Sequence, residues 1–587
     1  MAKHILEVGQ HPVFYYGSAY AGSLEPHYVA GVFLLLGESP SSYRIAMGGL
    51  VLLILIGVYV LTRQAFGRFA ALVALAYLAF PPFFFLYKGL TSDGHYDAFD
   101  LFTVAVLIFC IGIEEALQQG RDLRLLTFAL GFVIGLGWWL NPITPAISAT
   151  SVAWLLIRNR PRPPLRNALC VLAGFIVGSF PWIVWNFRHR WASLTSPELH
   201  GVDPRGALHN LSELLRHSLP ALAGGARLRV GTTWDVFPFS TFLVTFVLFV
   251  ILLPALRRAI SGDRISRLLL LCFAALVLTV IWSTRYAPGE PRVLFPYYVL
   301  VPPLVGLGLE RWSRGSPGRI LAALCGGVLL FAHASDMAVQ YRHLENTAGE
   351  VTASLDPLQD VLRKEHVSHV YTDYWTAYRL TFESNEEIIA SPIPGDEFVR
   401  YKPYQQEVEG DRSAAIVFRA DRDRCLDAYL REQKQPYRRI FVKPFGVFTH
   451  VPADVLGFLG RGAGIPLPRE AYRVSWGIGP HPNGILHGKA SQATVSFRNA
   501  GPCPWSTAVH LGYHWKPLDP GLPYIRDGGR GIPNRRIEPG EVVTMAVPLQ
   551  APGRPGRYLL EYDLVFEQVA WFHERGGATA TVPIEIR

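Results

Sequence analysis

The residues in this sequence that could do chemistry are polar side chains beside long apolar stretches. Glu25 follows a segment rich in aromatic and small residues, 14–24, and precedes a short apolar run. A carboxylate buried there could act as a general base that removes a proton from a hydroxyl. The same pattern is also typical of an aromatic belt in which Glu25 caps a helix. Glu25 is therefore a candidate catalytic residue, with capping as the alternative.

An acidic segment precedes the third long apolar run. Asp93, His95 and Asp97 alternate along it, and such side chains could bind a divalent cation or orient sugar hydroxyls. The alternative is an acidic first turn that complements the helix dipole. No residue is assigned as a metal ligand, and His95 and Asp97 are candidates for a polar substrate pocket.

Two arginines, Arg285 and Arg292, flank Glu290 ahead of another apolar run. A guanidinium can hold a phosphate group through paired hydrogen bonds. Both arginines are therefore candidates for phosphate binding, and a salt bridge with Glu290 at the membrane interface is the alternative.

A group of aromatic and basic residues, 182–191, contains Asn186 and ends the sixth apolar run. Such residues commonly anchor a helix at a membrane interface. The leucines that follow, at spacings of 3, 4 and 4, predict an amphipathic helix along the interface; they are Leu208, Leu211, Leu215 and Leu219.

The elements that must position these residues are apolar helices. About 20 helical residues span the hydrocarbon core of a membrane, and ten candidate runs occur before residue 340. They lie near 45–62, 69–87, 100–117, 125–140, 142–157, 167–184, 238–256, 267–283, 293–309 and 319–335. The fourth and fifth are split by Asn141-Pro142 and could form one broken helix. The pattern predicts a polytopic α-helical membrane protein with about ten transmembrane helices.

Charge predicts the orientation of these helices. Fifteen arginines occupy alternate loops, which places those loops in the cytoplasm by the positive-inside rule: Arg63, Arg68, Arg121, Arg124, Arg158, Arg160, Arg162, Arg166, Arg257, Arg258, Arg264, Arg267, Arg311, Arg314 and Arg319. Much of the net charge of +9 thus reflects topology. A nucleic-acid-binding protein is disfavoured, since only 17% of the residues are charged and half are hydrophobic.

This orientation places residues 1–43, the loop 185–237 and everything after 336 outside. Residues 345–455 mix helical and strand patterns and predict a small α/β domain. Residues 456–470, with repeated Gly and Pro, predict a linker. Residues 471–587 show short alternating strands separated by turn signals, which predicts a β-sandwich. The chain has six cysteines, too few for a disulfide framework; Cys425 and Cys503 lie in polar sequence, and nothing in the sequence argues that they pair.

Several of these motifs resemble one family. Bacterial membrane glycosyltransferases of the GT-C type, related to dolichyl-phosphate-mannose–protein mannosyltransferases and the aminoarabinose transferases of lipid A, have similar segments. The matching segments here are Tyr15-Tyr16-Gly17, Gly22-Ser23-Leu24-Glu25, and residues 185–191, 291–296 and 371–380. The resemblance covers roughly residues 1–450, with residues 1–340 as the transmembrane glycosyltransferase domain. Residues 471–587 are similar to an Ig-like accessory module, with Trp505 and Trp515 among the cues.

The resemblance implies transfer of a sugar from a polyprenyl-phosphate donor to an acceptor hydroxyl, usually with inversion, on the outer face of a bacterial plasma membrane. Glu25 would be the catalytic base, and Arg292 and Arg285 would bind the donor phosphate. Tyr16, His95, Asp97 and Asn186 would line the pocket for sugar and acceptor. The acceptor would be a glycan, lipid or protein, and a divalent cation is an optional cofactor.

Two other classes remain open, a membrane transporter and a non-catalytic scaffold or sensor with an exported binding module. A transporter also uses charged residues within its helices, whereas the polar groups here gather at one end of the predicted helices. The family's main acidic motif follows its first membrane helix, and the matching sequence would precede residue 2. We therefore expect an upstream apolar segment, without which the chain could be inactive.

Overall fold

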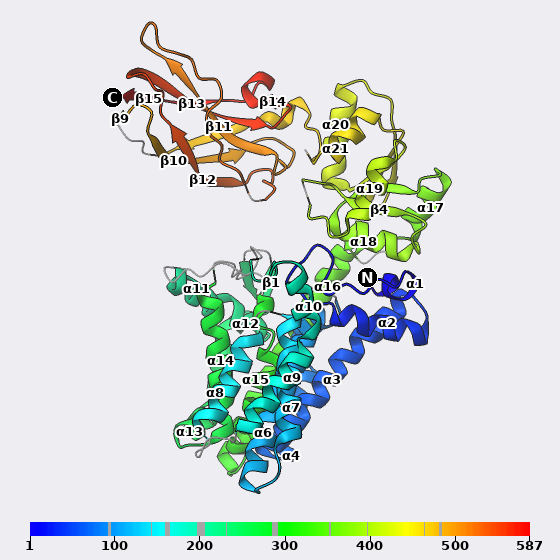
Figure 1. Cartoon of the computed structure of the whole chain (residues 1–587), viewed down its shortest axis with the longest axis vertical. Helices are drawn as coiled ribbons and strands as arrows, with labels where there is room; N and C mark the ends of the chain where they lie inside the picture. Colours follow the sequence, from blue (N-terminus) through cyan, green and yellow to red (C-terminus); the bar gives the residue numbers. More distant parts are fainter. Residues whose placement is uncertain are drawn as a thin grey trace. The chain divides into compact units, whose positions relative to one another are not determined.

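The computed structural model describes residues 1–587 except 92–95, 142–143, 159–164, 196–205, 230–231, 284–290, 352–353, 396, 463, 480–483 and 534. The chain forms two compact units, Met1–Thr347 and Ala348–Arg587. The first is helical and the second contains two β-sheet domains (Figure 1).

The first unit is a bundle of helices with one short hairpin. Its elements are α1 (Ala2–Glu7), α2 (Leu24–Leu36), α3 (Pro40–Phe66), α4 (Arg68–Ala79), α5 (Phe83–Gly89), α6 (Tyr96–Gln118), α7 (Arg124–Leu140), α8 (Thr144–Arg158), α9 (Leu165–Gly178), α10 (Phe180–Arg188), α11 (Ala207–Glu213), η3 (Leu214–Ser218), α12 (Leu219–Leu222), β1 (Ala226–Arg229), β2 (Thr232–Asp235), α13 (Ser240–Ile260), α14 (Arg264–Ile281), η4 (Pro291–Leu294), α15 (Tyr297–Trp312) and α16 (Ser316–Val351). Helix α16 continues into the second unit.

Each of the ten apolar runs overlaps a helix or a bent pair of helices. Among the described residues, five helices are long and apolar enough to cross a membrane: α3, α6, α13, α14 and the first part of α16. Two bent pairs, α4 with α5 at 75° and α9 with α10 at 63°, raise the number to seven. The chain is thus a helical membrane protein. Helices α7, α8 and α15 have only 15–17 residues, so length alone does not support ten crossings.

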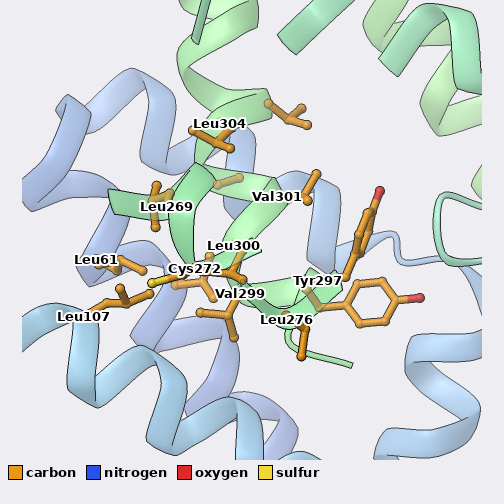
Figure 2. Close-up of a cluster of buried hydrophobic side chains, with 14 of the residues drawn as sticks. Leu61, Leu107, Leu269, Cys272, Leu276, Tyr297, Val299, Leu300, Val301 and Leu304 are labelled. Carbon is orange, nitrogen blue, oxygen red and sulfur yellow. The ribbon is translucent and has the colours of Figure 1, made fainter. Parts of the chain in front are cut away.

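Helix α15 forms the centre of the bundle, because every residue from Tyr297 to Gly308 is buried. Figure 2 shows its side chains among residues of α3, α6 and α14, including Leu61, Leu107 and Leu269. Gly308 lets α13 approach closely, since a Cβ there would lie 1.9 Å from the Ile251 carbonyl oxygen. Close helix packing of this kind is common where lipid replaces water around the helices.

Side chains of α16 form hydrogen bonds with the backbone at the break between α4 and α5. Pro81 and Pro82 interrupt the helix and leave backbone groups unpaired. His333 Nδ1 donates to the Phe80 carbonyl oxygen at 2.7 Å. Asp336 Oδ2 accepts from the Phe83 N–H at 2.9 Å. Backbone groups inside a membrane protein need such internal partners, because lipid offers none.

The two ends of the bundle differ in composition. The Arg258 guanidinium lies over the Phe66 ring, 5.9 Å from its centroid, so the arginine-bearing loops after α3 and α13 share one end. Figure 1 shows α10, α11, α12 and β1 at the other end. The predicted helix with the leucine spacing is observed there as the consecutive α11, η3 and α12.

The second unit begins with an α/β domain, as predicted. Its elements are α17 (Asp356–Lys364), β3 (His369–Thr372), α18 (Tyr374–Glu383), β4 (Ile389–Pro392), α19 (Lys402–Gly410), β5 (Ala415–Arg419), α20 (Ala420–Glu432), β6 (Arg438–Val442), β7 (Phe445–Thr449) and α21 (Ala453–Gly460). The sheet order is β4-β3-β5-β7-β6, with β4, β3 and β5 parallel and the β5–β7 and β7–β6 pairs antiparallel. Val370 and Tyr371 belong to separate hydrophobic clusters because alternate residues face opposite sides of a sheet.

A two-sheet sandwich follows, also as predicted. Its elements are η5 (Arg469–Tyr472), β8 (Val474–Ile478), β9 (Gly484–Ile485), β10 (Ala490–Asn499), β11 (Val509–Pro517), β12 (Val542–Gln550), β13 (Gly556–Phe566), β14 (Ala570–Trp571), η6 (Phe572–Arg575) and β15 (Ala580–Ile586). One sheet has the order β12-β10-β8 and the other β11-β13-β15-β9, with β14 beside β13. Both contribute to one core around Trp505 and Trp515. The Ig-like character of this sandwich stays a prediction.

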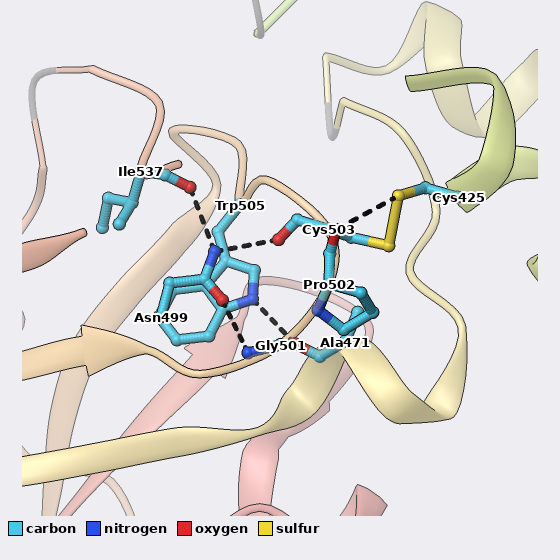
Figure 3. Close-up of a disulfide and its surroundings, with 8 residues drawn as sticks. All are labelled: Cys425, Ala471, Asn499, Gly501, Pro502, Cys503, Trp505 and Ile537. Atoms are coloured by element: carbon cyan, nitrogen blue, oxygen red, sulfur yellow. Dashed lines mark hydrogen bonds between the residues drawn. A yellow bond between two sulfur atoms is a disulfide. The ribbon is translucent and has the colours of Figure 1, made fainter. Parts of the chain in front are cut away.

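Cys425 in α20 and Cys503 form a disulfide across 78 residues (Figure 3). This pairing corrects the sequence analysis, in which nothing argued for it. The turn that carries Cys503 is held by Asn499, whose Nδ2 donates to the Cys503 carbonyl at 2.8 Å and to the Ile537 carbonyl at 3.2 Å.

The segment 456–470, predicted as a linker, differs from that expectation by being packed. Its first residues belong to α21, Ile465 is buried with the α/β domain, and Leu467 joins the sandwich core. Gly and Pro interrupt regular structure here, but the apolar side chains between them are still buried.

Candidate functional site

The segment ahead of Glu25 is a loop fastened to the end of α7. Gly22 donates its N–H to the Leu140 carbonyl at 3.0 Å, and Trp139 Nε1 donates to the Val13 carbonyl at 2.8 Å. A Cβ on Gly22 would lie 2.5 Å from the Trp139 carbonyl oxygen, so a larger residue there would push the loop away. Ser23 Oγ donates to the Val13 carbonyl at 3.1 Å. The loop therefore fixes the start of α2.

Glu25 lies in the first turn of α2 and is only 3% exposed. The carboxyl groups of Glu25 and Asp97 interact electrostatically although they are 72 residues apart in sequence. A helix start favours a negative charge through its dipole, but burial beside a second acid makes that charge costly. Sites that combine burial with like charges are frequent in catalysis.

Asp97 and Asp100 extend this acidic cluster into α6. They lie one turn apart, are 2% and 0% exposed, and interact electrostatically. Their carboxylate oxygens have no hydrogen-bond partner among the residues that the structure describes. Gly89 at the end of α5 is a neighbour of this cluster, since a Cβ on it would be in ordinary van der Waals contact with Asp97 Oδ1 at 3.5 Å. Three buried acids in one place can accept protons or attract a cation.

Arg292 lies on the short turn η4 and is half-buried. The turn is anchored by Phe295, whose ring stacks on Phe85 at 5.7 Å and lies 6.4 Å from the Tyr96 ring. Tyr96 immediately precedes Asp97. The predicted phosphate-binding segment and the acidic cluster are therefore neighbours at the start of α6.

Tyr16 and Asn186 make local hydrogen bonds within their own segments. The Tyr16 hydroxyl donates to Gln10 Oε1 at 2.8 Å and lies 2.9 Å from His4 Nδ1. Asn186 is fully buried, and its Oδ1 accepts from Ser193 Oγ at 2.7 Å. These bonds hold both side chains in fixed orientations.

The two segments nevertheless lie together, because the rings of Phe14 and Trp185 are 4.8 Å apart. A role of Tyr16 and Asn186 in a substrate pocket stays a prediction. His95 and Arg285, the remaining candidates, lie outside the described residues, as do Asp93 and Glu290.

The buried ionisable residues that were not singled out from the sequence include Asp100, His333 and Asp336. His333 is a polar residue inside an apolar run, which was a usable signal. Asp100 and Asp336 lie at the ends of apolar runs, where acids are usually solvated, and only the packing shows that they are buried.

The acidic cluster does not form a ready set of metal ligands within the described part of the chain. There, one group of three acidic or histidine side chains brings its ligand atoms within 4.8 Å of one another, and it lies in the β-sandwich rather than the bundle. We therefore derive no step through a metal ion.

No family model matches this chain, and no curated protein matches it in sequence. Solved structures are similar to it at low sequence identity. ArnT from Cupriavidus metallidurans bound to undecaprenyl phosphate is 12% identical over 77% of this chain and 92% of its own, with a TM-score of 0.45. The apo state of ArnT gives 10% identity, the same coverage and a TM-score of 0.47.

The archaeal oligosaccharyltransferase AglB from Archaeoglobus fulgidus, in complex with an inhibitory peptide and a dolichol-phosphate, is 11% identical. The similarity covers 99% of this chain and 92% of that one, with a TM-score of 0.45. ArnT holds undecaprenyl phosphate and AglB holds a dolichol-phosphate in these structures, so both neighbours bind a polyprenyl phosphate.

Proposed function

We propose that this protein transfers a sugar from a polyprenyl-phosphate donor to an acceptor hydroxyl at the extracytoplasmic face of a bacterial plasma membrane. The observation that supports the proposal most is the buried pair Glu25 and Asp97 beside the turn of Arg292. A base and a phosphate-binding cation within one apolar helical bundle are the groups that such a transfer needs. The resemblance of the sequence to GT-C glycosyltransferases points the same way.

In the proposed reaction, Glu25 accepts the proton of the acceptor hydroxyl while the hydroxyl oxygen attacks the anomeric carbon of the sugar. The bond from that carbon to the phosphate oxygen breaks, and the polyprenyl phosphate leaves with its charge held by Arg292, with Arg285 as a second phosphate ligand. Attack opposite the leaving phosphate inverts the anomeric centre. Asp97, with His95, Tyr16 and Asn186, would orient the sugar and the acceptor.

The proposed topology has ten crossings, with α7, α8 and α15 as short spans inside the bundle and the C-terminal domains outside. The disulfide between Cys425 and Cys503 supports the outside location of these domains, because disulfides persist in oxidising compartments.

The test uses the full chain reconstituted in bilayers with a panel of undecaprenyl-phosphate hexoses and pentoses. Release of undecaprenyl phosphate, measured by mass spectrometry, should depend on an added acceptor and fall about 100-fold or more in Glu25→Gln, since positioned general bases contribute about 10²–10⁴-fold. Glu7→Gln is the matched control, because Glu7 is a half-exposed acid in the neighbouring α1.

Two results would reject the proposal. One is that no donor in the panel is cleaved while the chain still moves a solute across the bilayer, as a transporter would. The other is that Glu25→Gln releases undecaprenyl phosphate as fast as the wild type. Binding of undecaprenyl phosphate without turnover of any donor would instead favour a sensor.

A further inference from the structure

A second polar cluster lies in the β-sandwich, in a different unit of the chain from the proposed transferase site. It consists of His514 on β11, Asp563 on β13 and His573 on η6, whose ligand atoms all lie within 4.8 Å of one another. None of the three takes part in the transfer proposed above. Strands β11, β13 and β14 are neighbours in one sheet (Figure 1).

Strand alternation places His514 and Asp563 on the outer face of that sheet. Tyr513 and Trp515 on β11, and Tyr562 and Leu564 on β13, face the sandwich core. The residues between them must face the other way. In the register of the pair, Gly512 is opposite Asp563, so His514 is its diagonal neighbour.

The outer face is covered locally by the turn after β13. The Trp571 ring lies 4.2 Å from the His514 ring, and a Cβ on Gly512 would lie 2.7 Å from the Trp571 ring. His514 and Asp563 are both 0% exposed as a result. The His573 side chain remains 42% exposed, so the cluster is open to solvent on one side.

The hydrogen bonds of His514 leave one ring nitrogen available as a ligand. Its Nδ1 bonds to the Arg526 carbonyl oxygen, and because a carbonyl can only accept, Nδ1 must carry the proton. In the neutral ring, Nε2 then has a lone pair. This nitrogen is buried and has no hydrogen-bond partner among the described residues. A carbonyl that fixes the other ring nitrogen is the usual support of a metal-binding histidine.

Nε2 faces a carboxylate oxygen rather than a donor. The distance from His514 Nε2 to Asp563 Oδ2 is 3.9 Å, too long for a hydrogen bond. Asp563 Oδ1 accepts from the Leu564 N–H at 2.8 Å, and Oδ2 is also 2.6 Å from His573 Nδ1. Two electron-rich atoms thus face each other in a buried place. A cation between them would turn this repulsion into attraction.

We propose that His514, Asp563 and His573 bind a divalent transition-metal ion of the zinc class, with the fourth position open to solvent. Two imidazoles and one carboxylate form a ligand set that zinc favours, and magnesium and calcium prefer oxygen ligands. Ligand atoms around a tetrahedral zinc ion are about 3.4 Å apart, given bonds of about 2.1 Å. The observed 2.6 Å and 3.9 Å bracket that value. A rotation of the half-exposed His573 away from Asp563 would make room for the ion.

The test is zinc binding by the full chain, purified without a polyhistidine tag, stripped with a chelator and held in bilayer discs. Titration with Zn²⁺ should show a site that the His573→Ala variant loses, with affinity for Zn²⁺ falling about 100-fold or more. That loss exceeds the roughly 10–100-fold cost of removing only an outer partner of a ligand. His573→Ala should fold normally because the side chain is partly exposed. Mg²⁺ at the same concentration should not compete.

His510→Gln is the matched control. His510 is on the same strand β11 but bonds to Glu567 at 2.9 Å, outside the cluster. It should bind Zn²⁺ as the wild type does. In thermal unfolding, Zn²⁺ should raise the Tm of the wild type and of His510→Gln, and leave that of His573→Ala unchanged. Equal Zn²⁺ affinity in the wild type and His573→Ala, or no binding in either, would show that the three residues form only an ion pair and would overturn the proposal.

Discussion

Glu25 and Asp97 can each be recognised as unusual from the sequence, but their proximity cannot. Each stands out because it is an acid beside apolar sequence. Their interaction across 72 positions depends on how α2 and α6 pack. Asp100 completes the cluster, but from sequence it is typical of an ordinary helix start.

The prediction for single residues concerns Arg292. Arg292→Ala should slow donor cleavage about 100-fold or more, because a preorganised charge that stabilises a leaving phosphate contributes several kcal/mol in the transition state. Arg292→Lys should recover part of the rate, since lysine offers charge without the guanidinium fork. The rate of undecaprenyl phosphate release measures both.

Arg188→Ala is the control for charge at the same end of the bundle, because Arg188 is an exposed arginine at the end of α10. An Arg292→Ala protein that is correctly folded and as active as the wild type would remove Arg292 from the mechanism.

Among the elements, the broken pair α4 and α5 shows how a helix interruption is tolerated in an apolar bundle. Its proline pair was visible in the sequence, whereas its partners on α16 were not. His333 and Asp336 are about 250 residues away along the chain, at a separation of 253 in both hydrogen bonds.

Asp336→Ala should lower the stability of the protein by about 1–3 kcal/mol, because the partly buried Phe83 N–H loses its acceptor. Asp336→Asn should cost less, since the amide oxygen can still accept this bond. Thermal unfolding in detergent measures the difference. Asp122→Ala, at an exposed loop position, should leave the Tm unchanged, and an equal loss in Asp336→Asn and Asp336→Ala would refute the role of the hydrogen bond.

A second prediction about the elements is that the arginine-rich loops lie on the cytoplasmic side of the membrane. Alkaline phosphatase fused after Gln340 should be active, because that position follows the last apolar run on the outer side. The same reporter fused at Arg160 should be inactive, because loops rich in arginine stay in the cytoplasm. Activity at Arg160 would contradict the topology and the outer location of the acidic cluster.

For the molecule as a whole, the disulfide joins the α/β domain to the sandwich within the second unit. Its contribution follows from the 78-residue separation that it closes. Replacing both partners in Cys425→Ser/Cys503→Ser should lower the free energy of unfolding of this unit by about 2–4 kcal/mol.

Pulse proteolysis of the full chain measures that loss. Cys170→Ser is the control, since Cys170 is a free, half-buried thiol in α9. If the double variant resists proteolysis as well as the wild type does, the disulfide does not stabilise the unit. The same conclusion follows if a reductant lowers the resistance of the double variant as much as it lowers that of the wild type.

The sequence by itself determined the apolar helices, the arginine asymmetry, the α/β domain and the sandwich, because each depends on periodicity and composition over neighbouring residues. It also identified Glu25, Asp97 and Arg292 as unusual. Only the tertiary structure decided which distant groups meet: the acidic cluster, the α16 partners of the broken helix, the disulfide and the His514–Asp563–His573 group. Most of these contacts join positions tens to hundreds of residues apart, and burial or pairing at such separations depends on how the elements pack rather than on any local pattern.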